Sequence, residues 1–97
     1  MATYIILVNY TQQGIQGIKQ SPERLDAARN AFKAMGANLD KWYLTLGQYD
    51  AVVISEAPDD ETAAKLALMV SSLGNVRTQT LRAFTEDEYR KLIAGLP

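Results

Sequence analysis

The side chains that could do chemistry in this sequence are of few types, because it has no cysteine and no histidine. Without thiols and imidazoles, the usual zinc and iron–sulfur sites, disulfides and histidine-activated nucleophiles are excluded. Carboxylates, tyrosines, lysines and arginines remain, and we expect neither a metal nor another cofactor. Seven residues are candidates for binding a ligand: Tyr10, Lys19, Arg24, Trp42, Tyr49, Asp50 and Arg77.

The cations and aromatic side chains of this set would suit a small anion site. The lysine and the two arginines could surround Asp50 and Tyr49 near the first turn of a predicted helix, where backbone N–H groups favour negative charge. A carboxylate or phosphate would then bind to the cations, with the aromatic side chains as a wall. A structural alternative stays open, in which Asp50 pairs with Lys19 or Arg24 and ties a hairpin to a loop.

Two carboxylates offer a different chemistry. Glu56 lies near the end of a predicted central strand, and partial burial there would suit a general base. Glu56 or Asp50 could accept a proton and Tyr49 could donate one, as in a cofactor-independent isomerase or oxygenase. No nucleophile or metal ligand accompanies Glu56, so an ion pair with a lysine or with Arg82 across an interface is the favoured interpretation.

Hydrophobic periodicity predicts the elements that must position these side chains. Strands are expected at about residues 3–10, 38–46, 49–57 and 76–83, and helices at about residues 21–35, 59–73 and 85–93. Ser21 and Asp59 are the expected N-caps of the first two helices, and Thr85 with Glu88 forms a capping box for the third. Residues 11–20 are predicted to form a polar loop, and Gly47-Gln48 predicts a tight hairpin.

The order of these elements, βαββαβ followed by a short C-terminal helix, predicts an α+β protein with the ferredoxin-like fold. We expect a four-stranded antiparallel sheet of order 4-1-3-2, with both main helices on one face. This topology brings the ligand-binding candidates to one edge of the sheet. The central strands are apolar on both faces, since Val52 and Ile54 alternate with Ala51 and Val53. A second chain is therefore expected to cover the other face.

Several motifs are spread over the whole chain. In order they are Gly14–Arg24, read as GI-x-x-IK-x-SPER, then Gly47 with Tyr49-Asp50, Glu56–Asp60, Gly74–Arg77 and Thr80–Phe84. With these motifs the sequence resembles the GYD domain family of small bacterial proteins, named for a Gly-Tyr-Asp signature. Here one residue separates the glycine from the tyrosine. The resemblance implies a ferredoxin-like fold of the dimeric α+β barrel type and no established biochemical activity.

Length and charge set further bounds. The chain has 97 residues, 47% of them hydrophobic, with ten Lys plus Arg against eleven Asp plus Glu. This length predicts a single domain over residues 1–97, and the balanced charge gives no basic surface for nucleic acid or a membrane. The apolar stretch Met1–Val8 lacks the basic leader and the cleavage site of a signal peptide, and no stretch approaches the roughly 20 apolar residues that cross a bilayer, so we expect a soluble cytoplasmic protein.

Three functions are compatible with these observations. The first is a homo-oligomer, at least a dimer, that binds a small anionic or aromatic metabolite without a metal or redox centre. The second is the small enzyme that uses Glu56 or Asp50 as its base. The third is a structural or regulatory subunit that builds larger assemblies through its second main helix, where Leu68 and Met69 lie off the apolar stripe.

Overall fold

The computed structural model describes all 97 residues. Strand β1 (Ala2–Tyr10) leads into two short helical segments, α1 (Gln12–Gln16) and η1 (Ile18–Gln20), and then into helix α2 (Ser21–Ala34). Strands β2 (Asn38–Leu44) and β3 (Ala51–Ala57) form a hairpin, which is followed by helix α3 (Asp60–Ser72), strand β4 (Val76–Ala83) and helix α4 (Glu86–Ala94). All the predicted strands and main helices are present, and the helical segments within residues 12–20 are additional.

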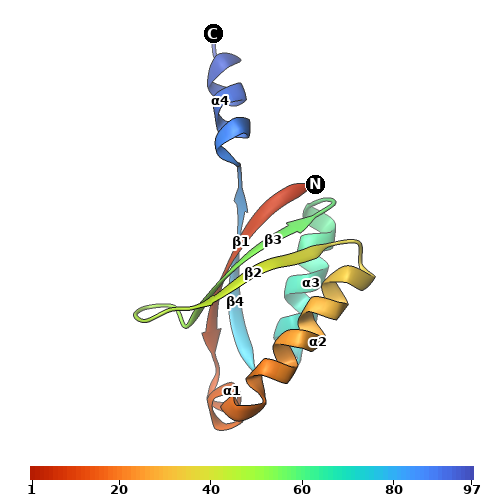
Figure 1. Ribbon diagram of the computed structural model, residues 1–97, viewed down its shortest axis with the longest axis vertical. Coiled ribbons are helices and arrows are strands. Elements are labelled where there is room, and N and C mark those ends of the chain that lie inside the picture. Colours follow the sequence, from red (N-terminus) through yellow and green to blue (C-terminus); the bar gives the residue numbers. More distant parts are fainter.

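The four strands form one antiparallel sheet of order β2-β3-β1-β4. This order confirms the predicted α+β ferredoxin-like fold, because β1 and β3 lie at the centre and β2 and β4 at the edges. Helices α2 and α3 pack on the same face of the sheet, as Figure 1 shows. No helix combines the length and the apolar character that crossing a membrane would require.

The core lies between the sheet and these two helices. Val8, Ala51 and Val53 project from the central strands toward Phe32 of α2 and Leu66 of α3, and all five residues are at most 8% exposed. Apolar residues at helical spacing give α2 and α3 the stripe that this contact buries. Because side chains alternate along a strand, the residues between the buried ones face away from the helices.

The opposite face of the sheet, which we call the open face, carries apolar side chains that no helix covers (Figure 1). Strand register places six of them there: Ile5, Leu7, Tyr43, Val52, Ile54 and Leu81. Tyr43 is 52% and Leu81 is 46% exposed. The central strands are therefore apolar on both faces, as the sequence predicts.

Helix α4 extends away from the rest of the molecule at the end of β4 (Figure 1). Its apolar residues Tyr89, Leu92 and Ile93 recur at helical spacing on one side, and each is at least 50% exposed. An isolated helix of nine residues is marginal in water. We therefore expect α4 to be stabilised by contact with another surface.

Two predicted helix caps are confirmed. The Asp59 carboxylate accepts a hydrogen bond of 2.8 Å from the backbone N–H of Thr62, at the start of α3. Thr85 and Glu88 form the complete capping box of α4. These backbone hydrogen bonds hold the pKa values of Asp59 and Glu88 below their usual values, because they favour the charged carboxylates.

The prediction that Ser21 caps the first main helix is wrong. Gln20, the residue before it, already has helical dihedral angles because η1 runs directly into α2, and no side chain caps this start. The Ser21 hydroxyl lies 3.3 Å from the Tyr10 hydroxyl instead. Residues 11–20 are not a loop, since Thr11 caps α1 by accepting a hydrogen bond from Gly14 N–H.

The tight hairpin predicted at Gly47-Gln48 is also wrong, because β2 ends at Leu44 and β3 begins at Ala51. Thr45 closes this longer connection, because its N–H and hydroxyl donate to the carbonyls of Asp50 and Tyr49. Asp50 is also bound to β1, since its backbone N–H donates to the carbonyl of Val8 and its carboxylate accepts from the N–H of Tyr10.

Candidate functional site

Helix α1 is fixed against the start of β4. The Thr11 N–H and hydroxyl donate to the carbonyls of Asn75 and Gly74 at 3.0 and 2.6 Å, and the Gln13 side-chain amide donates to the carbonyl of Leu73. Gly14 sits so close to β4 that a Cβ there would lie 2.0 Å from the Asn75 carbonyl oxygen. Only glycine permits this approach of the two backbones.

Arg24 connects the first turn of α2 to α1. Its guanidinium donates to the carbonyl of Gly17 at 2.9 Å and to that of Gly14 at 3.4 Å. The three ion pairs of the structure join other residues, so no carboxylate neutralises Arg24. A half-buried cation therefore lies at the end of the sheet where β1 ends and β4 begins.

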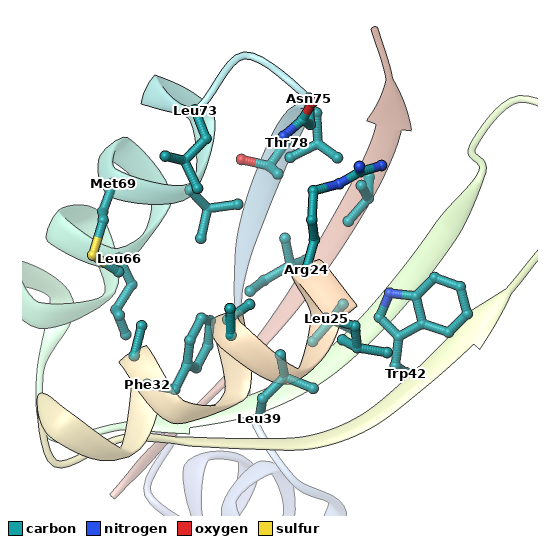
Figure 2. Close-up of a pocket in the computed structure, with 18 of the residues that line it drawn as sticks. Arg24, Leu25, Phe32, Leu39, Trp42, Leu66, Met69, Leu73, Asn75 and Thr78 are labelled. Carbon is teal, nitrogen blue, oxygen red and sulfur yellow. The ribbon is translucent and has the colours of Figure 1, made fainter. Parts of the chain in front are cut away.

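A cavity of about 370 Å³ lies between α2, α3 and the sheet. Of its 21 lining residues, 17 are hydrophobic. Figure 2 shows Leu66, Met69 and Leu73 along α3, Leu25 and Phe32 on α2, and Leu39 and Trp42 on β2. Its size and its mainly apolar lining are typical of a small-molecule site.

The polar groups of the cavity are gathered at one end. The four polar lining residues are Ser21, Arg24, Asn75 and Thr78, from the start of α2 and the start of β4. In Figure 2, Arg24 lies toward the end of the cavity marked by Asn75 and Thr78, whereas Phe32 and Leu39 lie at the other end. The cavity thus has a polar end and an apolar end.

The seven predicted binding residues do not form one cluster. Tyr10, Arg24 and Trp42 line the cavity. Arg77 pairs with Asn9, which alternates with Tyr10, so it belongs to the open face instead.

The other predicted residues are also outside the cavity. The Tyr49 hydroxyl donates to the side chain of Gln79, whose partner in the register is Leu7 of the open face. Lys19 is exposed in η1. The three cations are therefore dispersed: Arg24 lines the cavity and Lys19 is exposed in η1, whereas Arg77 shares the open face with Gln79, the partner of Tyr49.

In the structural alternative Asp50 ties the hairpin to the loop through an ion pair, whereas the structure shows Asp50 bound to β1. Asp50 makes no ion pair with Lys19 or Arg24. Its carboxylate instead accepts the backbone N–H of Tyr10 at 2.8 Å. Asp50 therefore ties the hairpin to β1, and this bond occupies one of its carboxylate oxygens.

Among the candidate catalytic residues, Glu56 lies too far from Tyr49 and Asp50 to act with them. Asp50 immediately precedes β3 and Glu56 is near its other end, six residues away, which corresponds to about 20 Å along a strand. Tyr49 lies beside Asp50, so Glu56 and Tyr49 cannot act on the same bond within one chain. Glu56 faces the open side, paired with Thr3 and Asn38, and makes no ion pair within the chain.

Besides the two helix caps Asp59 and Glu88, Tyr4 near the start of β1 also has a shifted pKa. The buried Tyr4 hydroxyl donates to the Asp60 carboxylate at 2.5 Å. This hydrogen bond is the main cause that raises the pKa of Tyr4 above its usual value of 10.0, and desolvation adds to it. The bond fastens β1 to the first turn of α3 and fixes the far end of the layer that encloses the cavity.

Sequence reasoning missed the cavity itself. Its signal is a set of small residues on the facing sides of the two helices, Ala27 and Ala31 of α2 and Ala67 of α3. Alanines beside an apolar stripe are also typical of any stable helix, because alanine is the best helix former. Because their side chains are short, they leave space between α2 and α3.

Comparison with known proteins agrees with this fold. The sequence profile described as "GYD domain" matches residues 4–93. The chain is 34% identical over 84 residues to a protein of Thermus thermophilus named "Glutamine synthetase and cystathionine beta-lyase binding protein". The aligned residues make up 86% of this chain and 88% of the relative. The chain is also similar to the crystal structure of TTHA0845 from the same species, with a TM-score of 0.57 and 25% identity over 88% of this chain and 95% of that one.

Proposed function

Because the chain belongs to the GYD domain family, we propose that it is a non-catalytic binding subunit, which associates with copies of itself and with partner enzymes. The observation that carries this proposal is the uncovered apolar surface of the open face and α4. The separation of Glu56 from Tyr49 removes the geometric basis for Glu56 as the base of the enzyme alternative, and the Asp50 carboxylate of that alternative already accepts the Tyr10 N–H. Binding through surfaces needs no catalytic constellation.

The open face supports self-association. Strands about 4.8 Å apart, with about 3.4 Å per residue over the seven registered pairs of β1 and β3, give it an area on the order of 400 Å². The apolar side chains at the centre of this face form a patch of the kind that is often functional in proteins. A second copy offers the same apolar side chains on its open face, and two such sheets can pack face to face about a two-fold axis.

Helix α4 supports the binding of a partner protein. Its apolar side, formed by Tyr89, Leu92 and Ile93, has the i, i+3, i+4 spacing of a helix that enters a groove. The helix projects from the body, so this side remains accessible (Figure 1). We assign α4 to contact with the partner enzyme.

The name of the 34% identical relative gives the partners to test first, glutamine synthetase and cystathionine β-lyase. Each purified enzyme from the source organism is immobilised, and binding of the full chain is measured by biolayer interferometry. We expect binding to at least one of them. Leu92→Asp, which puts a charge on the apolar side of α4, should abolish it.

A matched control is Ala94→Asp, which adds the same charge to the other side of α4. It should bind like the wild-type protein, because position 94 lies away from the apolar side. Failure of the wild-type protein to bind either enzyme would overturn the assignment of partners. Equal binding by Leu92→Asp and the wild type would overturn the role of α4.

A further inference from the structure

The apolar end of the cavity is poorly suited to water. A buried water needs two to four polar partners, and the lining residues around Phe32, Leu39 and Leu66 are hydrophobic. The volume of about 370 Å³ lies within the range of ligand pockets. An apolar group from a ligand would recover the contacts that the lining side chains lack.

The polar end carries one charge, and it is positive. Arg24 is the only charged residue among the 21 that line the cavity. Its guanidinium has five N–H donors, of which the hydrogen bonds to Gly17 and Gly14 use two. Donors therefore remain for a further acceptor, and no carboxylate of the chain supplies it.

Two neighbouring features favour the same kind of acceptor. The first turn of α2, which contains Arg24, lies at the positive end of the dipole of a 14-residue helix. The hydroxyls of Ser21 and Tyr10 lie 3.3 Å apart beside it, and both residues line the cavity. These groups offer an anion both charge and hydrogen bonds.

From this arrangement we infer that the cavity binds a small monocarboxylate with an apolar body, whose carboxylate pairs with Arg24 while its body lies between α2 and α3. The ligand would bind in one orientation (Figure 2). Its carboxylate would lie at the polar end, near Asn75 and Thr78, and its apolar body at the other end, near Phe32 and Leu39. This site differs from the predicted one at the hairpin, and it is independent of partner binding through α4.

The test uses 4-phenylbutyrate and its uncharged counterpart 4-phenylbutan-1-ol, titrated into the full chain and followed by heteronuclear NMR. The acid should bind saturably at one site per chain, more tightly than the alcohol, with shifts at the cavity residues Ile6 and Val76. Arg24→Gln should weaken the acid about tenfold or more, since hydrogen bonds to ions are the stronger ones, and leave the alcohol unchanged.

A second variant fills the cavity. Ala67→Leu adds three carbon atoms from α3 and should weaken both compounds without removing Arg24. Circular dichroism verifies that each variant is folded. If Arg24→Gln is not folded, the preference of the wild-type protein for the acid over the alcohol tests the role of the positive charge instead.

Three results would overturn the inference. The first is the absence of saturable binding of the acid to the wild-type protein at millimolar concentration. The second is equal affinity for the acid and the alcohol, which would remove the role of Arg24. The third is a set of intermolecular NOEs from Leu92 or Ile93 of α4 to Phe32, which would show that a second copy occupies the cavity.

Discussion

Replacing Gly14 by alanine should destabilise the protein through a backbone clash. The added Cβ would lie 2.0 Å from the carbonyl oxygen and 3.0 Å from the carbonyl carbon of Asn75. Neither atom belongs to a flexible side chain, so α1 must move away from β4. Such a movement breaks the hydrogen bonds that Thr11 and Gln13 make to residues 73–75.

The size of the effect follows from these bonds. Four hydrogen bonds at about 1 kcal/mol each give a loss of about 4 kcal/mol. Alanine is a better helix former than glycine by about 1 kcal/mol, which offsets part of the loss within α1. We expect Gly14→Ala to lower the free energy of unfolding by about 3 kcal/mol.

Urea unfolding followed by circular dichroism, at one protein concentration for all variants, measures this loss. Gly17→Ala is the matched control, because the nearest neighbour of its Cβ would be the flexible end of Arg24, at 3.3 Å, and its nearest backbone atom would be at the ordinary contact distance of 3.7 Å. The control should stay within about 1 kcal/mol of the wild type. If Gly14→Ala were equally stable, α1 would not pack on β4 as described, and the polar end of the cavity would lose its support.

Two other predictions concern carboxylates. Asp50→Ala removes the acceptor of the Tyr10 N–H and should lower the free energy of unfolding in urea by about 1 to 3 kcal/mol. Asp50→Asn keeps an acceptor and should lower it less. An equal loss in the two variants would contradict this role of Asp50. The lowered pKa of Asp59 means that its stabilising effect is complete above the unfolded value of about 3.8 and is lost as the pH falls below it. The thermal midpoint of Asp59→Asn, which caps without titrating, should therefore fall less between pH 5 and pH 3 than that of the wild type, and parallel curves would refute this.

The parts of the fold that could be predicted depend on local patterns. Alternating apolar strands and helical stripes define the sheet and the two main helices. The caps at Asp59 and Thr85 are recognisable because each hydrogen bond joins residues three apart in the sequence. Helix α1 is different, since it has only five residues, one of them a glycine, and contacts with residues 73–75 hold it.

The sequence could predict at which edge of the sheet the candidate residues lie, but not which face of the sheet each side chain occupies. Arg24 and Tyr10 lie at the expected edge and line one cavity. Arg77 and Tyr49 belong to the open face instead, because the register pairs Tyr10 with Val76 rather than with Arg77. A shift of one residue reverses the face, and the sequence does not determine pairing across strands 66 residues apart.

The central claim, that a second copy covers the open face, is tested most directly by size-exclusion chromatography with multi-angle light scattering. At micromolar concentration the wild-type protein should have the mass of at least two chains. Leu81→Lys, which places a charge on the open face, should give the mass of one chain. Leu46→Lys, the same change at a residue 98% exposed in the hairpin, should leave the mass unchanged. A wild-type protein with the mass of one chain would contradict the account.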